Sequence, residues 1–419
     1  MQHNIKDRSQ HPWTNSMADA IQKCVHCGFC LPACPTYQVL GEEMDSPRGR
    51  IFLMKEVLED RVGLDSALPY MDKCLGCVGC ETACPSGVPY GELLTAFRAT
   101  AEPQRVRSMS NRVMRKFVLA TLPFVGRFRW ALRIGLLTKP FRRLVPSAFR
   151  PMLQLLPKSI PASRPLPEVN PAVGPRRARV ALHIGCAQQV LAPEINWATV
   201  RVLTQNGVEV VVPKAQACCG ALAAHTGEIE QAKSFAAQNI RAFPADVDAI
   251  VTNAAGCGSG IHEYGLWLKG TAEEEAGEAF AKRTQDVSQF LDQLGLVSPP
   301  RAKQRVRVAY HDACHLGHAQ RIKQPPRKLL KKIAGVELVE IPHGEMCCGS
   351  AGTYNIEQPE MAKRLGQEKV ASIQSVQPDI VVMGNIGCMM QIRSALNVDS
   401  KIKIMHTMEF FDQCYRGEW

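Results

Sequence analysis

Short apolar runs alternate with segments of helical period along the C-terminal part of the chain. Each run is rich in β-branched residues and ends at a turn. Apolar residues then recur three or four positions apart, which is typical of a strand followed by a helix. Repeated strand–helix units favour a parallel sheet covered by helices. The predicted strands span residues 179–184, 208–212, 249–252, 306–310, 336–341 and 379–383.

The N-terminal part has a different pattern. Ser46 followed by Pro47 is typical of a helix N-cap with proline in the first turn. Ile51, Met54 and Leu58 then fall on one helical face. A mainly α-helical region is therefore expected before the strand–helix units.

Cysteine changes this picture, because the chain of 419 residues contains 17 and most of them occur in repeats. The run Cys-x2-Cys-x2-Cys-x3-Cys-Pro starts at Cys24 and again at Cys74. In bacterial ferredoxins three thiolates of such a run bind one [4Fe–4S] cubane and the fourth reaches the other cluster. On that rule the ligands are Cys24, Cys27, Cys30 and Cys84 for cluster one, and Cys74, Cys77, Cys80 and Cys34 for cluster two.

Two such runs exceed the needs of one zinc ion, which takes four ligands in all. We therefore expect two [4Fe–4S] clusters. The 39 residues between the runs have helical patterning, which predicts a helical ferredoxin-like domain over residues 1–100 instead of the strand-linked minimal ferredoxin. His26 lies inside the first cysteine loop, where we expect it to face solvent.

A second repeat, with a period near 130 residues, divides the strand–helix region into a first half, residues 178–300, and a second half, residues 301–419. In each half one cysteine follows the first strand, a Cys-Cys-Gly triplet comes next, and a last cysteine follows an asparagine. Ligand sites of α/β folds lie just beyond strand ends. The candidate ligands are Cys186, Cys218, Cys219 and Cys257 in the first half, and Cys314, Cys347, Cys348 and Cys388 in the second.

Four thiols that recur at similar spacing favour a metal site, an iron–sulfur or a zinc site, in at least one half. The alternative is buried, reduced cysteines that pack behind the strands. Adjacent cysteines strain a tetrahedral site, while the glycine after them permits a tight turn. His315 and His318 could add a ligand in the second half, although a non-ligand role is favoured for each. Cys414 is isolated and is expected to be inert.

The net charge of +11 is concentrated in residues 101–150, which contain twelve Arg or Lys and one acid. Arginines interrupt the apolar run around Phe128 and Trp130, so it is not a plain transmembrane span. A membrane-surface helix and a docking site for an acidic partner subunit fit this segment equally well. Charge alone also permits nucleic-acid binding, but no nucleic-acid motif accompanies it, and none is expected.

The segment 101–177 combines these basic helices with a predicted linker, because residues 151–175 carry seven prolines. Residues 1–20 lack the apolar core of a signal peptide. Clustered, reduced thiols suit a cytoplasmic compartment. We expect a cytoplasmic protein that is peripheral on the inner face of the cytoplasmic membrane.

The chain lacks the motifs of organic redox cofactors. It has no GxGxxG after a first strand, no P-loop and no HExxH sequence. One-electron carriers without a two-electron cofactor imply that a flavin lies on a partner subunit.

Each half resembles the cysteine-rich CCG domains of heterodisulfide reductases and related subunits. The pattern of that family ends in Cys-x-x-Cys, whereas the halves end in Cys257-Gly-Ser-Gly260 and Cys388-Met-Met-Gln391. Each half therefore keeps four of the five cysteines. This departure counts against a five-thiolate cluster and leaves a four-thiolate site open.

The whole arrangement resembles the iron–sulfur subunits of glycolate oxidase (glycolate dehydrogenase), on residues 24–37, 47–51, 347–354 and 385–388. The resemblance implies FAD-binding partner subunits that oxidise glycolate or D-lactate, and electron transfer through this chain toward membrane quinone. No residue of this chain is then catalytic.

Three other functions remain compatible with the residues. The chain could be the iron–sulfur subunit of another flavin dehydrogenase, acting on glycerol 3-phosphate or D-lactate. It could be a thiol–disulfide reductase in which a cluster of a CCG domain attacks a disulfide, although the missing fifth cysteines count against it. It could also be a zinc-bound scaffold without redox activity.

Overall fold

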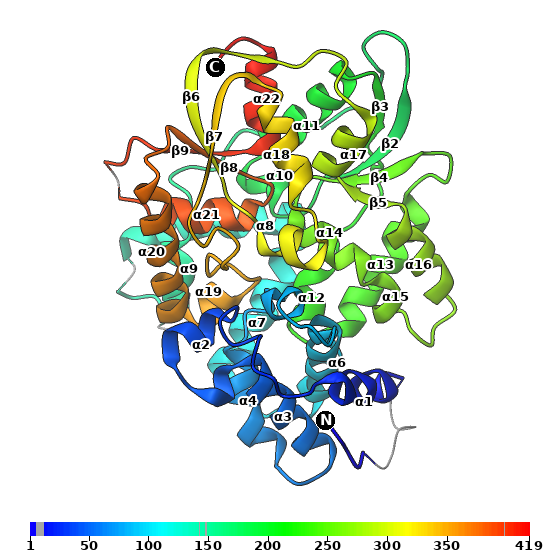
Figure 1. The fold of residues 1–419 in the computed structure, drawn as a ribbon, viewed down its shortest axis with the longest axis vertical. Coiled ribbons are helices and arrows are strands. Elements are labelled where there is room, and N and C mark those ends of the chain that lie inside the picture. Colours follow the sequence, from blue (N-terminus) through cyan, green and yellow to red (C-terminus); the bar gives the residue numbers. More distant parts are fainter. Residues whose placement is uncertain (6–11, 142, 147–148, 398) are drawn as a thin grey trace.

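The computed structural model describes residues 1–5, 12–141, 143–146, 149–397 and 399–419 (Figure 1). From Thr14 to Ala101 the regular elements are all helical and form the lower part of the molecule in Figure 1. They are α1 (Thr14–Lys23), α2 (Pro35–Leu40), η1 (Glu43–Asp45), α3 (Pro47–Leu58), α4 (Leu64–Asp72), α5 (Gly79–Thr82) and α6 (Tyr90–Ala101).

Helix α3 begins where the sequence predicted. The Ser46 hydroxyl accepts a hydrogen bond from the Gly49 amide at 3.0 Å, and Pro47 occupies the first turn. Ile51 and Met54 are buried in the core of this region, and Leu58 is half-buried against it.

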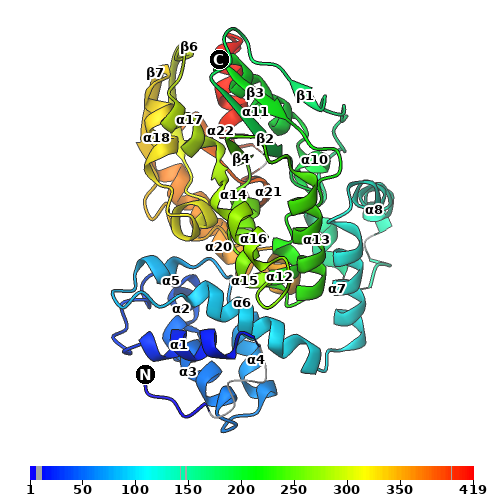
Figure 2. The same ribbon diagram turned by 90° about the vertical axis from the view of Figure 1, so that its right-hand side faces the viewer.

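The basic segment forms η2 (Glu102–Gln104), α7 (Met109–Thr121), α8 (Val125–Thr138), η3 (Lys139–Phe141) and α9 (Arg150–Gln154). Figure 2 shows α7 and α8 alongside α13 of the first half. Leu119 of α7 belongs to the apolar core of that half, so the segment is partly docked. Among the described residues, no helix combines the length and the apolar character needed to cross a membrane.

The first half contains a five-stranded sheet in the order β1-β3-β2-β4-β5, in which only β1 is antiparallel to its neighbour. Its strands are β1 (Val169–Asn170), β2 (Ala178–His183), β3 (Val208–Val211), β4 (Ala249–Thr252) and β5 (Thr284–Asp286). Its helices are α10 (Gln188–Leu191), α11 (Glu194–Gln205), α12 (Ala221–His225), α13 (Ile229–Ala242), α14 (Ala255–His262), α15 (Tyr264–Trp267), α16 (Glu274–Lys282) and α17 (Val287–Leu294).

The second half repeats this order as a parallel four-stranded sheet, β7-β6-β8-β9. Its strands are β6 (Arg301–Tyr310), β7 (Ala334–Glu340), β8 (Ile380–Met383) and β9 (Lys403–His406). Its helices are the π-helix η5 (His315–Ala319), α18 (Gln324–Lys331), α19 (Tyr354–Glu357), α20 (Pro359–Ser375), α21 (Ile386–Ala395) and α22 (Thr407–Tyr415).

All six predicted strands are confirmed, each within a few residues of its expected bounds. The prediction missed β1, β5 and β9, which are two to four residues long. β1 lies inside the predicted linker, where Val169 pairs with Val211. The proline-rich segment therefore joins the sheet at its end.

The two halves share one apolar core in addition to the core that the first half forms on its own. Strand residues of both sheets, such as Val180 and Val308, belong to the same buried cluster. Helix α11 packs on α22, and α17 packs on α18, so each half contributes one helix to each pair. Across the first pair Arg201 makes a two-pronged ion pair with Asp412, with N–O distances of 2.8 and 2.7 Å.

Candidate metal centres

Four ferredoxin thiols surround one cavity in the N-terminal helical region. Cys24 follows α1, Cys27 and Cys30 lie in the next loop, and Cys84 follows α5. All four line the same cavity, with Cys80 at its wall. His26 in this loop is exposed, as expected, and its Nε2 lies 3.2 Å from the Met1 sulfur.

The other four thiols surround a neighbouring cavity. Cys34, at the start of α2, joins Cys74, Cys77 and Cys80 from the second run. The fourth cysteine of each run lines the cavity of the other run, and Cys80 lines both cavities, so the assignment of the eight thiols to two sets stays a prediction. Four thiols around an apolar cavity fit a [4Fe–4S] cubane; binding of the clusters stays a prediction.

Buried positive charge lies beside the second cavity. Arg50 is 1% exposed, donates to the Tyr70 carbonyl at 2.8 Å, and has its Nη1 3.8 Å from the Cys34 sulfur. Burial raises the pKa of the Cys74 thiol, but the charges of Arg50 and Arg98 outweigh it and lower that pKa. A lowered pKa favours the thiolate, which is the form that binds iron.

The first cavity is lined by Arg48 instead, which is partly exposed and whose charge is paired with Glu43 at 2.8 Å. Burial raises the pKa of the Cys30 thiol to about 11. Cluster binding there must release protons from the thiols. The two cavities therefore differ in electrostatics although their sequence motifs are the same.

In the first half, the candidate thiols lie at the carboxyl ends of three parallel strands. Cys186 follows β2, the Cys218–Cys219 pair follows β3, and Cys257 lies on α14 after β4. The Cys186 and Cys218 sulfurs are 3.3 Å apart. Gly220 has φ +85°, and a Cβ there would lie 3.0 Å from the Trp267 ring, so the expected tight turn does require glycine.

The second half repeats this arrangement. Cys314 follows β6, the Cys347–Cys348 pair follows β7, and Cys388 lies on α21 after β8. The Cys314 and Cys347 sulfurs are 4.0 Å apart. Gly349 has φ +89° and, with a Cβ, would come within 2.7 Å of a backbone carbonyl.

The second cysteine of each adjacent pair is the most acidic thiol. Cys218 and Cys257 donate to Cys219 and lower its pKa well below the usual value. Cys347 and Cys388 do the same to Cys348. Each half therefore places one thiolate at the centre of its cysteine set.

The positions of the absent fifth cysteines are filled by packing. A Cβ at Gly260 would lie 2.6 Å from the Cβ of Ala221. Gln391 is buried and donates to the Ala362 carbonyl at 2.8 Å. A fifth thiolate from these positions is excluded sterically in the first half and replaced by a structural amide in the second.

His315 and His318 lie near the cysteines, but their ring nitrogens have other partners. Nδ1 of His315 lies 2.8 Å from the Ser259 hydroxyl. His318 lies 2.7 Å from the Thr82 hydroxyl through Nδ1 and 3.1 Å from the Glu345 carbonyl through Nε2. These contacts agree with the favoured non-ligand roles. Cys414 is buried in the shared core, and burial raises its pKa to about 12, which agrees with an inert thiol.

Sequence reasoning missed His311. Its ring nitrogen and the sulfurs of Cys348 and Cys388 lie within 4.8 Å of one another. The signal was present, because His311 and His183 occupy the same place in the 130-residue repeat, His183 as the last residue of β2 and His311 directly after β6.

The second half also contacts the second ferredoxin cavity. Leu75 and Cys77 pack in one apolar cluster with Cys314 and Cys347. Burial, and next the Cys314 sulfur, raise the pKa of Cys77. The Tyr354 hydroxyl donates to the Lys73 carbonyl at 3.0 Å. The thiols of the second half therefore cover one side of this cavity.

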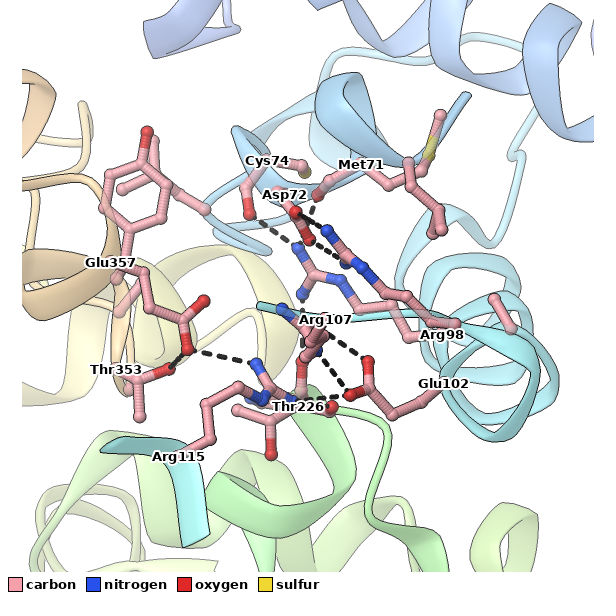
Figure 3. Close-up of a pocket in the computed structure, with 18 of the residues that line it drawn as sticks. Met71, Asp72, Cys74, Arg98, Glu102, Arg107, Arg115, Thr226, Thr353 and Glu357 are labelled. Atoms are coloured by element: carbon pink, nitrogen blue, oxygen red, sulfur yellow. Dashed lines mark hydrogen bonds and ion pairs between the residues drawn. The ribbon is translucent and has the colours of Figure 1, made fainter. Parts of the chain in front are cut away.

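An arginine-rich pocket lies where the ferredoxin helices meet both halves (Figure 3). Arg98 donates to the carbonyls of Met71 and Cys74, both at 2.8 Å. Arg107 pairs with Glu102 at 2.6 Å, and Arg115 of α7 pairs with Glu357 of the second half at 3.0 Å. The pocket thus joins the second ferredoxin cavity to the basic segment through a network of charges.

Comparison with known proteins defines the class first. The 4Fe-4S dicluster domain family matches residues 20–88, and the cysteine-rich domain family matches residues 180–262 and 308–393. These matches cover more than half of the chain and indicate an iron–sulfur protein with a duplicated cysteine-rich domain.

Full-length relatives then define the family. The chain is 38% identical to the probable glycolate oxidase iron-sulfur subunit of Bacillus subtilis, over 91% of both chains. It is 35% identical to the glycolate oxidase iron-sulfur subunit of Escherichia coli, over 96% of both chains. The chain belongs to the family of glycolate oxidase iron–sulfur subunits.

Two further proteins are similar over part of the sequence or in fold alone. The lactate utilization protein A of Geobacillus thermodenitrificans is 33% identical, over 55% of this chain and 97% of its own length. The crystal structure of a hypothetical protein from Helicobacter pylori has a TM-score of 0.56 at 9% identity, covering 96% of this chain and 72% of that chain, and shares the fold.

Proposed function

We propose that this chain carries electrons in a flavin-dependent 2-hydroxy acid dehydrogenase complex that oxidises glycolate or D-lactate. The observation that carries the proposal is the arrangement of eight thiols around two adjacent cavities in a chain of this family. Bound [4Fe–4S] clusters supply one-electron transfer. Cys24, Cys27, Cys30 and Cys84 hold cluster one, and Cys34, Cys74, Cys77 and Cys80 hold cluster two.

The side of cluster one is suited to receive electrons from an FAD-binding partner subunit. Cys27 is exposed at the surface, and Val25 and Phe29 beside it are 66% and 67% exposed. Exposed apolar residues around a redox site are typical of a docking surface. Buried thiols of the second half cover the side of cluster two.

The side of the arginine pocket is suited to deliver electrons toward membrane quinone. Cys74 lines this pocket, and Arg115 in its wall belongs to α7. From there α7 and α8 continue along the first half to a surface on which Trp130, Leu137 and Phe141 are exposed next to Arg133 and Lys139. Apolar and basic side chains together suit an anionic membrane surface, where each basic residue contributes about 1 kcal/mol.

The remaining organisation follows from this function. A helical ferredoxin-like domain of residues 1–100 holds the clusters, the exposed face of α8 and η3 within residues 101–177 contacts the membrane, and the two halves support them. The protein then acts on the inner face of the cytoplasmic membrane. The thiol–disulfide reductase function is disfavoured, because packing fills the positions of the fifth cysteines.

The test is reduction of the clusters by substrate. The chain is purified without oxygen together with its flavin subunits, and iron, acid-labile sulfide and electron paramagnetic resonance are measured. We expect about eight irons per chain and a cluster signal after addition of glycolate or D-lactate. A signal that develops only with glycerol 3-phosphate would show that the substrate is not a 2-hydroxy acid. A colourless preparation would contradict electron transfer altogether.

The membrane surface is tested separately by flotation of the complex with vesicles. We expect binding to vesicles that contain phosphatidylglycerol, and weaker binding after Trp130→Ser with Leu137→Ser. Equal recovery with neutral vesicles, or no effect of the double substitution, would assign this surface to a partner subunit.

A further inference from the structure

His311 is buried in a way that calls for a partner. It follows β6 at the centre of the second sheet and is 1% exposed. Among the described residues neither ring nitrogen has a nitrogen or oxygen partner, and the polar group that the ring faces is the Cys348 thiol, whose pKa it helps to lower. An unsatisfied buried polar group costs about 1–3 kcal/mol, so such positions need an explanation.

The ring is directed at two thiols. One ring nitrogen and the sulfurs of Cys348 and Cys388 all lie within 4.8 Å of one another. They come from three separate segments, which are the end of β6, the loop after β7 and the start of α21. Segments that far apart in the sequence converge in this way only through the tertiary fold.

The spacing of these atoms fits a single metal ion. Metal–ligand bonds of about 2.0–2.3 Å place the ligand atoms of a tetrahedral zinc site about 3.5–3.8 Å apart. Thiolates of a cubane bind different irons and must stand further apart. Within the described chain, no second set of three His, Cys or acidic ligand atoms converges to 4.8 Å, and that includes the ferredoxin thiols around their cavities.

We propose that the second half binds one metal ion of the zinc class through His311, Cys348 and Cys388. The convergent set contains neither Cys314 nor Cys347, so the fourth position of a tetrahedral ion is left to a water molecule. Borderline-soft Zn²⁺ suits a set of thiolates and one imidazole. The ion has no redox role, so this site lies outside the electron path.

The role that follows is structural. The ion ties the end of β6 to the Cys-Cys-Gly loop and to α21, and the same loop contacts Leu75 and Cys77 beside cluster two. A metal site held by three segments therefore fixes the surface against which the ferredoxin domain rests.

The first half offers a matched control. His183 occupies the equivalent position, but its Nε2 is 3.2 Å from the Ala217 carbonyl, and its ring stacks on Phe243 at 6.2 Å. It does not converge with two thiols as His311 does. Substitution of His183 should therefore disturb packing without removing a metal ligand.

The experiment uses Co²⁺ as a spectroscopic probe on the full chain, with the iron–sulfur clusters intact. The wild-type chain should bind one Co²⁺ in excess of its iron, with a sulfur-to-cobalt charge-transfer band. His311→Gln should weaken this binding at least tenfold, whereas His183→Gln should leave it within twofold. His311→Cys should restore binding with a stronger charge-transfer band, because a thiolate replaces the imidazole.

Two further readouts keep the test decisive. The resonance signal of the ferredoxin clusters reports whether each variant has folded, and rescue by His311→Cys separates a lost ligand from lost packing. Unchanged Co²⁺ affinity in His311→Gln, or absence of Co²⁺ binding to the wild type, would overturn the proposal. Iron and sulfide clearly above eight per chain that decrease in His311→Gln would overturn it too, because the site would then hold a cluster.

Discussion

The two halves carry the same cysteine spacing and the same order of parallel strands, yet their thiols have different neighbours. In the second half Cys314 and Cys347 pack with Leu75 and Cys77 of the ferredoxin region. In the first half the thiols pack with Tyr264, Trp267 and Phe280. Within the described chain, that first-half cluster contains no residue before Leu119.

The difference follows from combining a duplicated unit with a single N-terminal domain. The one ferredoxin domain packs against the cysteine set of the second half, beside cluster two. Its contacts with the first half are made elsewhere, through Arg98 to the His225 carbonyl at 3.1 Å and through Trp13 to the Leu266 carbonyl at 3.0 Å. Duplication in sequence therefore does not imply equal roles.

The strongest way to sharpen the comparison is to remove one thiol from each region. Cys77→Ser should remove cluster two, which lowers the iron content by about four per chain, and should abolish electron transfer to quinone. Cys186→Ser should leave the iron content unchanged if the first half carries no cluster. Iron analysis and quinone reduction by the complex measure both.

Cys414→Ser is the matched control for these thiols, because that side chain only packs in the core. Normal quinone reduction by Cys77→Ser would contradict the electron path. Loss of iron from Cys186→Ser would show that the first half holds a cluster. The two halves would then differ in their cofactor as well as in their neighbours.

A smaller effect, on stability, tests a buried hydrogen bond between the two halves. His406 of the second half donates through Nε2 to the Asn253 carbonyl beside the first cysteine set at 2.7 Å, and its Nδ1 accepts from the Met408 amide. Burial lowers the pKa of His406 to about 4. Because the unfolded chain binds this proton below a pKa of about 6.5, the stability that neutral His406 contributes is full above pH 6.5 and is lost as the pH falls toward 4.

We expect His406→Asn to destabilise the chain at pH 7 and to flatten its pH dependence. The difference in unfolding free energy between wild type and variant should shrink by about 2 kcal/mol from pH 7 to pH 5. Denaturant unfolding at several pH values measures it. A constant difference across this range would mean that His406 does not stay neutral in the folded chain.

The smallest expected effect concerns the contact between the second half and the ferredoxin domain. Thr82 and Nδ1 of His318 are 2.7 Å apart. A double-mutant cycle with Thr82→Val and His318→Phe should give a coupling of about 1 kcal/mol. The pair Thr95 and Glu263 at 3.5 Å, on the side of the first half, should give a weaker coupling. A larger coupling for Thr95 and Glu263 than for Thr82 and His318 would contradict the expectation that the ferredoxin domain contacts the second half more tightly.

Strong local signals made much of the fold predictable. Ser46 and Pro47 specify the start of α3 by themselves, since capping involves only neighbouring backbone. Strands β4 and β8 are buried on both faces and are therefore almost entirely apolar, which is easily recognised in the sequence. β1, β5 and β9 were not predicted, because each contains no more than two apolar residues and is stabilised by pairing with a neighbouring strand rather than by an apolar run of its own.

The sequence by itself determined the two cysteine runs and the duplicated Cys-Cys-Gly pattern. It also predicts how the ferredoxin thiols divide between two clusters, because fixed local spacing constrains which thiols can reach one cluster. Only the tertiary structure decided that the second half covers cluster two, that packing fills the fifth-cysteine positions, and that His311, rather than His315 or His318, faces two thiols. Those facts depend on contacts between segments far apart in the chain, and no local pattern encodes such distances.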